Sequence, residues 1–115
     1  MGLMALAAGA CASAPPAPDA ALQAAQQAIT TAEGVDAGRS APGELAEARG
    51  KLNDANVAVK AGRMASAERL ALQSRAAADL AAAKTASTKA LAVNEEMKVG
   101  NAALMQELNR NGESK

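Results

Sequence analysis

Alanine fills 34 of the 115 positions of this chain, while phenylalanine, tyrosine, tryptophan and histidine are absent. Leucine, isoleucine, valine, methionine and cysteine together supply only 23 residues. Because large side chains provide most of the apolar area that a fold buries, this chain has to pack through small residues brought close together. Alanine is also the strongest intrinsic helix former. The composition therefore predicts an all-α protein of one domain.

The same composition excludes several classes of function. Without histidine there is no imidazole for acid–base catalysis or metal binding. The formal net charge is zero, with 12 basic and 12 acidic residues, which gives no patch for tracking phosphates. The adjacent carboxylates of Glu95 and Glu96 point about 100° apart on a helix and do not form a catalytic pair. We therefore expect no enzyme, no cofactor, no metal, no nucleic-acid partner and no small-molecule substrate.

The amino-terminal segment is apolar and ends at the single cysteine of the chain. Residues 1–10 carry no charge, and Ala8-Gly9-Ala10-Cys11 resembles the bacterial lipobox. The resemblance implies that 1–10 is a lipoprotein signal peptide and that Cys11 is lipidated, with palmitate among its acyl chains. Because no Lys or Arg precedes the apolar run, we expect the signal peptide to begin upstream of Met1. The alternatives are an ordinary cleaved signal or an apolar terminus with an unmodified thiol.

The segment after the cysteine predicts where the protein is anchored. Residues 11–18 hold three prolines and form a short extended tether after the lipidated cysteine. The residue after Cys11 is Ala12, whereas an aspartate there would retain such a lipoprotein in the inner membrane. We therefore expect the periplasmic face of the outer membrane, with acyl chains as the contact to the bilayer.

Glycine and proline divide the remaining chain, 19–110, into three predicted helices. The first runs from Asp19, expected as its cap, to about Glu33, and residues 34–40 form a turn. The second begins near Pro42 and closes at Gly62. The third runs from Met64 to about Arg110, and 111–115 is expected to be a flexible tail. This pattern predicts three antiparallel helices, with the long third helix protruding beyond the other two.

Apolar residues at heptad-like spacing predict how the second and third helices pack. Leu45, Leu52 and Val59 are expected to lie against the stripe that contains Leu70, Ala77 and Leu80. The stripe of the third helix is predicted to comprise Ala67, Leu70, Ala71, Ser74, Ala77, Ala78, Ala81, Thr88 and Leu91. Its small residues allow a neighbouring helix to approach closely.

The apolar stripe changes position in the far half of the third helix. On a straight helix, Met97, Leu104 and Leu108 lie nearly opposite Leu70. Either the far half forms a coiled coil with another helix, or the helix is interrupted between Asn94 and Gly100. Its apolar residues cannot all be covered by the first two helices. We therefore expect a partner, either another copy of the chain or a protein of the envelope.

From Pro42 onward the chain resembles an uncharacterised family of short, alanine-rich proteobacterial outer-membrane lipoproteins with a domain of unknown function. The matching segments are Ala41-Pro42-Gly43-Glu44-Leu45, Ala48, Lys51-Leu52, Ala61-Gly62-Arg63-Met64, Ala67, Leu70-Ala71 and Ala76-Ala77-Ala78-Asp79-Leu80-Ala81. In some relatives the domain precedes an OmpA-like domain. The last segment resembles tetratricopeptide-like helical hairpins, which implies that kind of packing. The family implies no catalytic residues.

These observations favour a non-enzymatic envelope lipoprotein with a structural or adaptor role exerted through helix–helix contacts. A second hypothesis is a tether joined to peptidoglycan through the carboxy-terminal Lys115. A third is a soluble helical coat protein, which requires an unmodified Cys11.

Overall fold

The computed structural model describes residues 16–113, and this part of the chain is helical nearly throughout. Its elements are α1 (Asp19–Gly34), α2 (Ala37–Ser40), α3 (Pro42–Lys60) and α4 (Met64–Glu113). No strand occurs within residues 16–113, so the predicted all-α class is confirmed. The predicted signal peptide, Cys11 and Lys115 lie outside the described residues.

The ends of α3 follow from its proline and its following glycine, as predicted. Pro42 is the first residue of α3, where its missing N–H costs no helical hydrogen bond. Past the other end, Gly62 adopts a positive φ of 76°. The N–H of Gly62 donates to the Val59 carbonyl at 3.0 Å, and that of Arg63 to the Ala58 carbonyl at 2.9 Å. This pair of bonds is the Schellman motif, which turns the chain sharply into α4.

The connection between α1 and α3 differs from the expected turn. Asp36 adopts the left-handed conformation, with φ 65° and ψ 33°, and the chain then forms the single turn of α2. Asp19, the expected cap of α1, is instead its first helical residue; Pro18 occupies the cap position and makes no side-chain cap bond. The carboxylate of Asp19 still lies in the first turn, where the helix dipole favours a negative charge.

The last helix, α4, is continuous for 50 residues, which corresponds to a length of about 75 Å. It passes through Gly100 without a break, so the expected alternative of an interruption between Asn94 and Gly100 is wrong. One glycine costs about 1 kcal/mol, which strong helix formers on both sides offset. The helix also includes residues 111–113, which were expected to belong to the tail.

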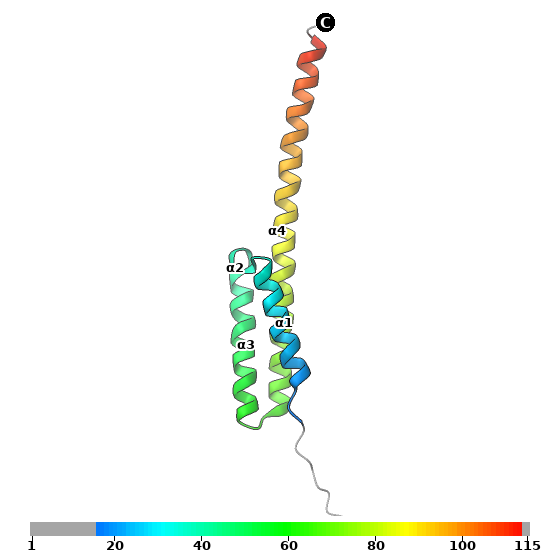
Figure 1. Cartoon of the computed structure of the whole chain (residues 1–115). Helices are drawn as coiled ribbons and strands as arrows, with labels where there is room; N and C mark the ends of the chain where they lie inside the picture. Colours follow the sequence, from blue (N-terminus) through cyan, green and yellow to red (C-terminus); the bar gives the residue numbers. More distant parts are fainter. Residues whose placement is uncertain (1–15, 114–115) are drawn as a thin grey trace, which may run out of the picture.

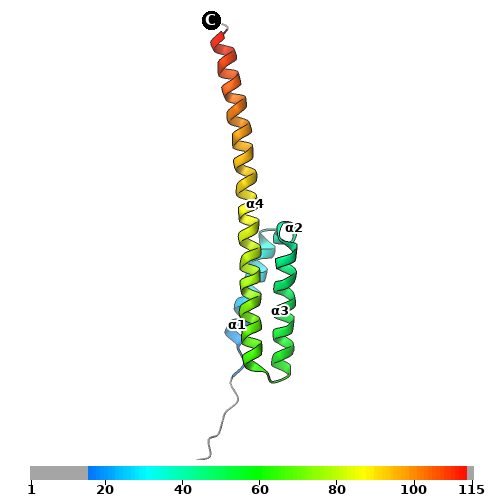
Figure 2. The same ribbon diagram turned by 180° about the vertical axis from the view of Figure 1, so that it is seen from behind.

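Three of the helices pack side by side over less than half of the length of α4. Figure 1 shows α1 and α4 running in one direction and α3 returning in the other, and Figure 2 shows the same arrangement from behind. Contacts join α3 to α4, α1 to α4 and, less extensively, α1 to α3. We call α1, α2, α3 and residues 64–85 of α4 the base. The predicted tetratricopeptide-like form of this packing stays a prediction.

The core of the base is built almost entirely from alanine. Ile29 and Leu45 are the only large apolar side chains that are buried within residues 16–113. The buried alanines are Ala25, Ala32, Ala37, Ala41, Ala48, Ala55, Ala58, Ala67, Ala71, Ala77, Ala78 and Ala81. Side chains this small let neighbouring backbones approach closely, but each contributes little buried area. The base therefore depends on close contact of helices rather than on a thick apolar core.

Candidate interaction site

The far half of α4 extends beyond the base and forms the most exposed part of the described structure. We call residues 86–113 the arm; every one of them is exposed, whereas Thr85, just before it, is fully buried. Figure 1 shows the arm continuing past the top of α1 and α3 with no other element beside it. The arm is about 42 Å long at the usual helical rise.

Large apolar side chains gather on one face of this arm. We call Val93, Met97, Leu104 and Leu108 the apolar band; their exposed fractions are 53%, 60%, 58% and 57%. At 100° per residue these four side chains fall within about 60° of each other around the helix. The three other large apolar residues of the arm, Leu91, Val99 and Met105, lie on other faces. The band consists of two apolar pairs on one face, and the described part of the chain leaves both uncovered.

The band is not an extension of the face that α4 buries in the base. The buried residues of α4 are Ala67, Ala71, Ser74, Ala77, Ala78, Ala81 and Thr85. The centre of this buried stripe and the centre of the band are about 120° apart around the helix axis. A helix that continued the packing of the base would therefore not cover the band. The sequence predicted that the apolar stripe of this helix changes face in its far half. The structure shows this change within α4, which is continuous.

Polar contacts fix α4 against the rest of the base at the start of the arm. Lys84 forms an ion pair with Glu44 of α3, and the Lys89 ammonium donates to the Val35 carbonyl beyond α1 at 2.8 Å. The hydrogen bond from Lys84 lowers the pKa of the Glu44 carboxyl below its ordinary value. A cation near the end of α1 also complements the negative end of that helix. These contacts hold the start of the arm in place relative to the base.

The predicted packing residues occupy three different environments. Leu45 and Ala77 are buried in one core cluster, and Leu52 packs against that cluster while half-buried. Val59 and Leu70 are also intermediate in burial. Leu80, in contrast, is 50% exposed and lies at a surface groove of about 400 Å³ beside Glu47 and Lys51.

The exposure of Leu80 corrects its predicted place in the seam. Ala78 and Ala81 point into the base, and Leu80 is rotated from them by about 160° and 100° around α4. The expected stripe also continues too far, because Thr88 and Leu91 are exposed. Thr85, which the prediction omitted, is the last buried residue, and its hydroxyl donates to the Ala81 carbonyl at 2.8 Å.

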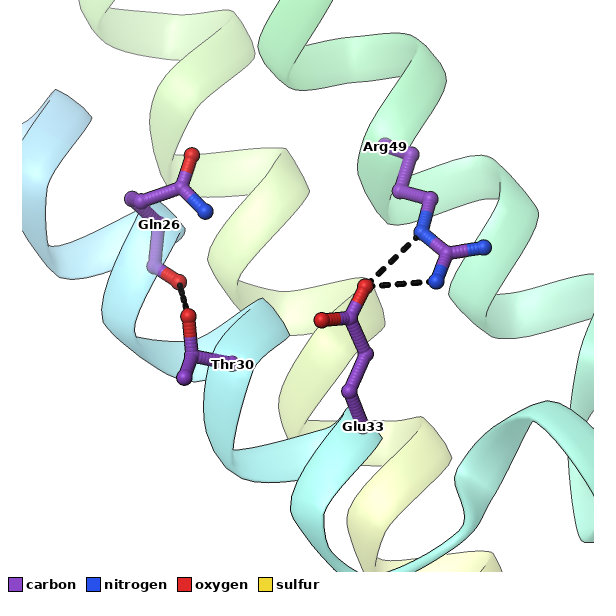
Figure 3. Close-up of polar contacts among 4 residues, drawn as sticks. All are labelled: Gln26, Thr30, Glu33 and Arg49. Carbon is purple, nitrogen blue, oxygen red and sulfur yellow. Dashed lines mark hydrogen bonds and ion pairs between the residues drawn. The ribbon is translucent and has the colours of Figure 1, made fainter.

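Polar links between the helices were not predicted from the sequence. The buried hydroxyl of Ser74 in α4 donates to the Ala48 carbonyl of α3 at 2.6 Å. On the surface, Arg49 of α3 donates through Nε and Nη2 to one oxygen of Glu33 in α1, at 3.0 and 2.5 Å (Figure 3). Figure 3 also shows Thr30 donating to the Gln26 carbonyl within α1. A small polar residue inside an alanine stripe is the signal that marks Ser74.

The described residues form neither a cluster of metal ligands nor a membrane-spanning helix. Within 16–113 no three Cys, Asp or Glu residues come together as metal ligands, and every buried side-chain polar atom has a hydrogen-bond partner. None of the helices from α1 to α4 combines the length and the hydropathy that crossing a bilayer requires. The exposed apolar band of the arm is the candidate interaction site of this part of the chain.

The architecture defines an all-helical protein in which an alanine-packed base carries a protruding helical arm. The chain belongs to the family described as domain of unknown function (DUF4398), which matches residues 20–97. The predicted membership in a family of unknown function is thereby confirmed. The match covers the base and the first part of the arm, including Val93 and Met97. No curated protein and no solved structure matches the chain.

Proposed function

We propose that this chain is a non-enzymatic lipoprotein of the outer membrane, facing the periplasm, whose arm binds another helix. The observation that carries the proposal is the apolar band. Its four large side chains lie on one face of a continuous helix, and each is more than half exposed. Exposed apolar surface of this kind marks interaction sites in soluble domains. A face of a single helix presents its anchors at helical spacing, which suits another helix as the partner.

The two ends of the described structure support an anchored base that presents the arm. The first turn of α1 lies at the end of the base that is farthest from the arm (Figure 1), and Pro16 and Pro18 precede it in the sequence. Acyl chains on Cys11 would hold this end at the membrane, and the arm would point away from it. The lipobox-like Ala8-Gly9-Ala10-Cys11 supports the anchoring step.

The anchoring step is tested by comparing the wild type with Cys11→Ala. We expect the wild type in the outer-membrane fraction, with a mass that shows loss of residues 1–10 and gain of acyl chains. The Cys11→Ala form should leave the membrane fraction. A wild-type protein with a free thiol and no added mass would contradict lipidation and favour a soluble coat protein.

The binding step is tested by crosslinking in intact cells with two matched variants. Leu104→Asp puts a carboxylate in the band, whereas Leu91→Asp puts the same group on another face of the arm. We expect the first to remove the main crosslinked species and the second to retain it. Equal crosslinking by wild type and both variants would contradict a binding role for the band.

A further inference from the structure

The spacing of the apolar band is the same when it is read in either direction along the helix. Val93, Met97, Leu104 and Leu108 are separated by 4, 7 and 4 positions. The centre of this pattern falls between Gly100 and Asn101. A helix face with this symmetry can match itself when a second, identical helix runs antiparallel to it.

We infer that the partner of the arm is a second copy of this chain, bound antiparallel about a two-fold axis at Gly100 and Asn101. This inference rests on the proposed binding role of the arm and names its partner. In this arrangement Val93 lies opposite Leu108 of the second copy, and Met97 lies opposite Leu104. Each interaction occurs twice, as an interface between identical surfaces requires.

The residues at the axis fit a close crossing of two helices. A Cβ atom added to Gly100 would meet no atom within 4 Å, so this side of the arm is open. Glycine lets two helix backbones approach closely where they cross. Asn101 lies beside it at the same level, and the apolar pairs stand on both sides of this small, polar centre.

The charges of the arm are compatible with self-association in this register. Lys98 stands opposite Ala103 of the second copy, and Glu95 stands opposite Gln106. Glu107 stands opposite Asn94, while its carboxylate accepts bonds of 2.6 and 2.7 Å from Arg110 of its own helix. No charged residue of the described arm lies directly opposite another charge. The arrangement therefore avoids the like-charge contacts that oppose most symmetric pairings.

The length of the arm also fits the pairing. Glu113, the last described residue, lies opposite Thr88 of the second copy. Thr85 is the last residue of α4 that the base buries. The described arms can therefore overlap over their whole length while both bases stay outside the contact, one at each end.

The contact area indicates a reversible dimer. A strip about 42 Å long and 10 Å wide covers on the order of 400 Å² of each helix. Stable complexes bury about 800 Å² per partner. We therefore expect association in the micromolar range rather than a permanent dimer.

The dimer is tested by sedimentation of the full chain carrying Cys11→Ser, from about 1 to several hundred micromolar. We expect a monomer–dimer equilibrium, and Leu104→Asp should weaken it at least about tenfold by burying a carboxylate in the contact. Leu91→Asp, which lies off the band, should leave the dimerisation constant within about twofold. Circular dichroism should show that the base stays folded in both variants.

The antiparallel register is tested with single cysteines on the Cys11→Ser chain. When Val93→Cys and Leu108→Cys forms are mixed and oxidised, the mixed disulfide should exceed both homodimers by about tenfold. Leu108→Cys that crosslinks to itself equally well would overturn the antiparallel arrangement. A chain that stays monomeric throughout would overturn the second copy as partner. If Leu104→Asp still removed a crosslinked envelope protein in cells, the proposed binding role would stand without the dimer.

Discussion

The two halves of α4 use apolar residues in opposite ways. In the base, the helix buries alanines such as Ala67, Ala71 and Ala78, which are fully inaccessible. In the arm, the same helix exposes leucine, valine and methionine side chains by 53% to 67%. The apolar residues that α4 buries in the base are thus alanines, whereas the large apolar side chains of the arm are all exposed. This difference fits the proposal that the chain itself covers the base whereas a partner covers the arm.

The alanine packing of the base has an energetic consequence. Each buried alanine removes little apolar area from water, so the core gains less than one filled with leucine. Specific contacts carry a larger share of the stability: the buried bond of Ser74 and the ion pairs between helices. The arm has no such contacts to other helices beyond Lys89 in the described structure. Changes of the same chemical type should therefore act very differently in the two regions.

The largest contrast is expected for one substitution made in both regions. Leu45→Ala should lower the free energy of unfolding by about 3 kcal/mol, because it removes one of the two large buried apolar side chains. Leu104→Ala should change it by less than about 0.5 kcal/mol in dilute solution, because that side chain is 58% exposed. Urea denaturation followed by circular dichroism measures both. Equal losses would mean that the arm is part of the folded core.

A smaller contrast is expected for serine. Ser74→Ala should destabilise the base by about 1–2 kcal/mol, because its hydroxyl is buried and donates to the Ala48 carbonyl of α3. Ser87→Ala, in the exposed arm, should be nearly silent. A silent Ser74→Ala, in the same denaturation experiment, would show that this bond does not hold α4 against α3.

Glycine replacements should have opposite signs in the two regions. Gly62→Ala should destabilise the base by about 1 kcal/mol, because φ is 76° at the turn. Gly100→Ala should stabilise the arm helix by up to about 1 kcal/mol, because the residue is helical and a Cβ there meets no atom within 4 Å. The midpoint of urea denaturation reports the first effect and far-ultraviolet circular dichroism on warming reports the second. A stabilising Gly62→Ala would contradict the Schellman turn.

The smallest effect is expected from acid. Lys84 lowers the pKa of Glu44 in the folded chain, so the unfolded state binds the proton more readily. The pair therefore stabilises the fold above the ordinary pKa of Glu44 and loses that contribution as pH falls through the lowered value. Solvent around Lys84, 52% exposed, keeps the effect small. When the free energy of unfolding is measured against pH, Glu44→Gln should reduce the loss of stability in acid. An unchanged dependence on pH in this range would show that the pair contributes nothing.

The helix boundaries could be predicted because single residues determine them. Pro42 and Gly62 set the ends of α3, since proline suits a first turn and glycine the positive φ of a helix end. The alanine stripe of α4 was predictable for a different reason, because the spacing of its residues follows the helical period. The continuity of α4 through Gly100 was not predictable. The penalty of one glycine is similar in size to the preferences of its neighbours.

Contacts between helices were less predictable, because they depend on the relative rotation of the helices. In an alanine-rich helix many faces look alike. The sequence pattern therefore did not show that Leu80 is exposed and that Thr85 is buried. The bond from Ser74 to Ala48 required the register of α4 against α3, which spacing along one helix does not specify. The exposure of the arm was easier to predict, because its apolar residues change face and no second helix of matching length lies within residues 16–113.

Hydrogen exchange along α4 tests most directly whether the base folds by itself while the arm stays bare. Well below the dimerisation constant, where the chain is monomeric, amides of residues 68–85 should be protected to nearly the level of global unfolding. Amides of residues 90–110 should exchange at least about tenfold faster, because an unsupported helix frays. Raising the concentration should then slow exchange in the arm alone. Uniform protection along the whole of α4 in the monomer would contradict the division into a folded base and a bare arm.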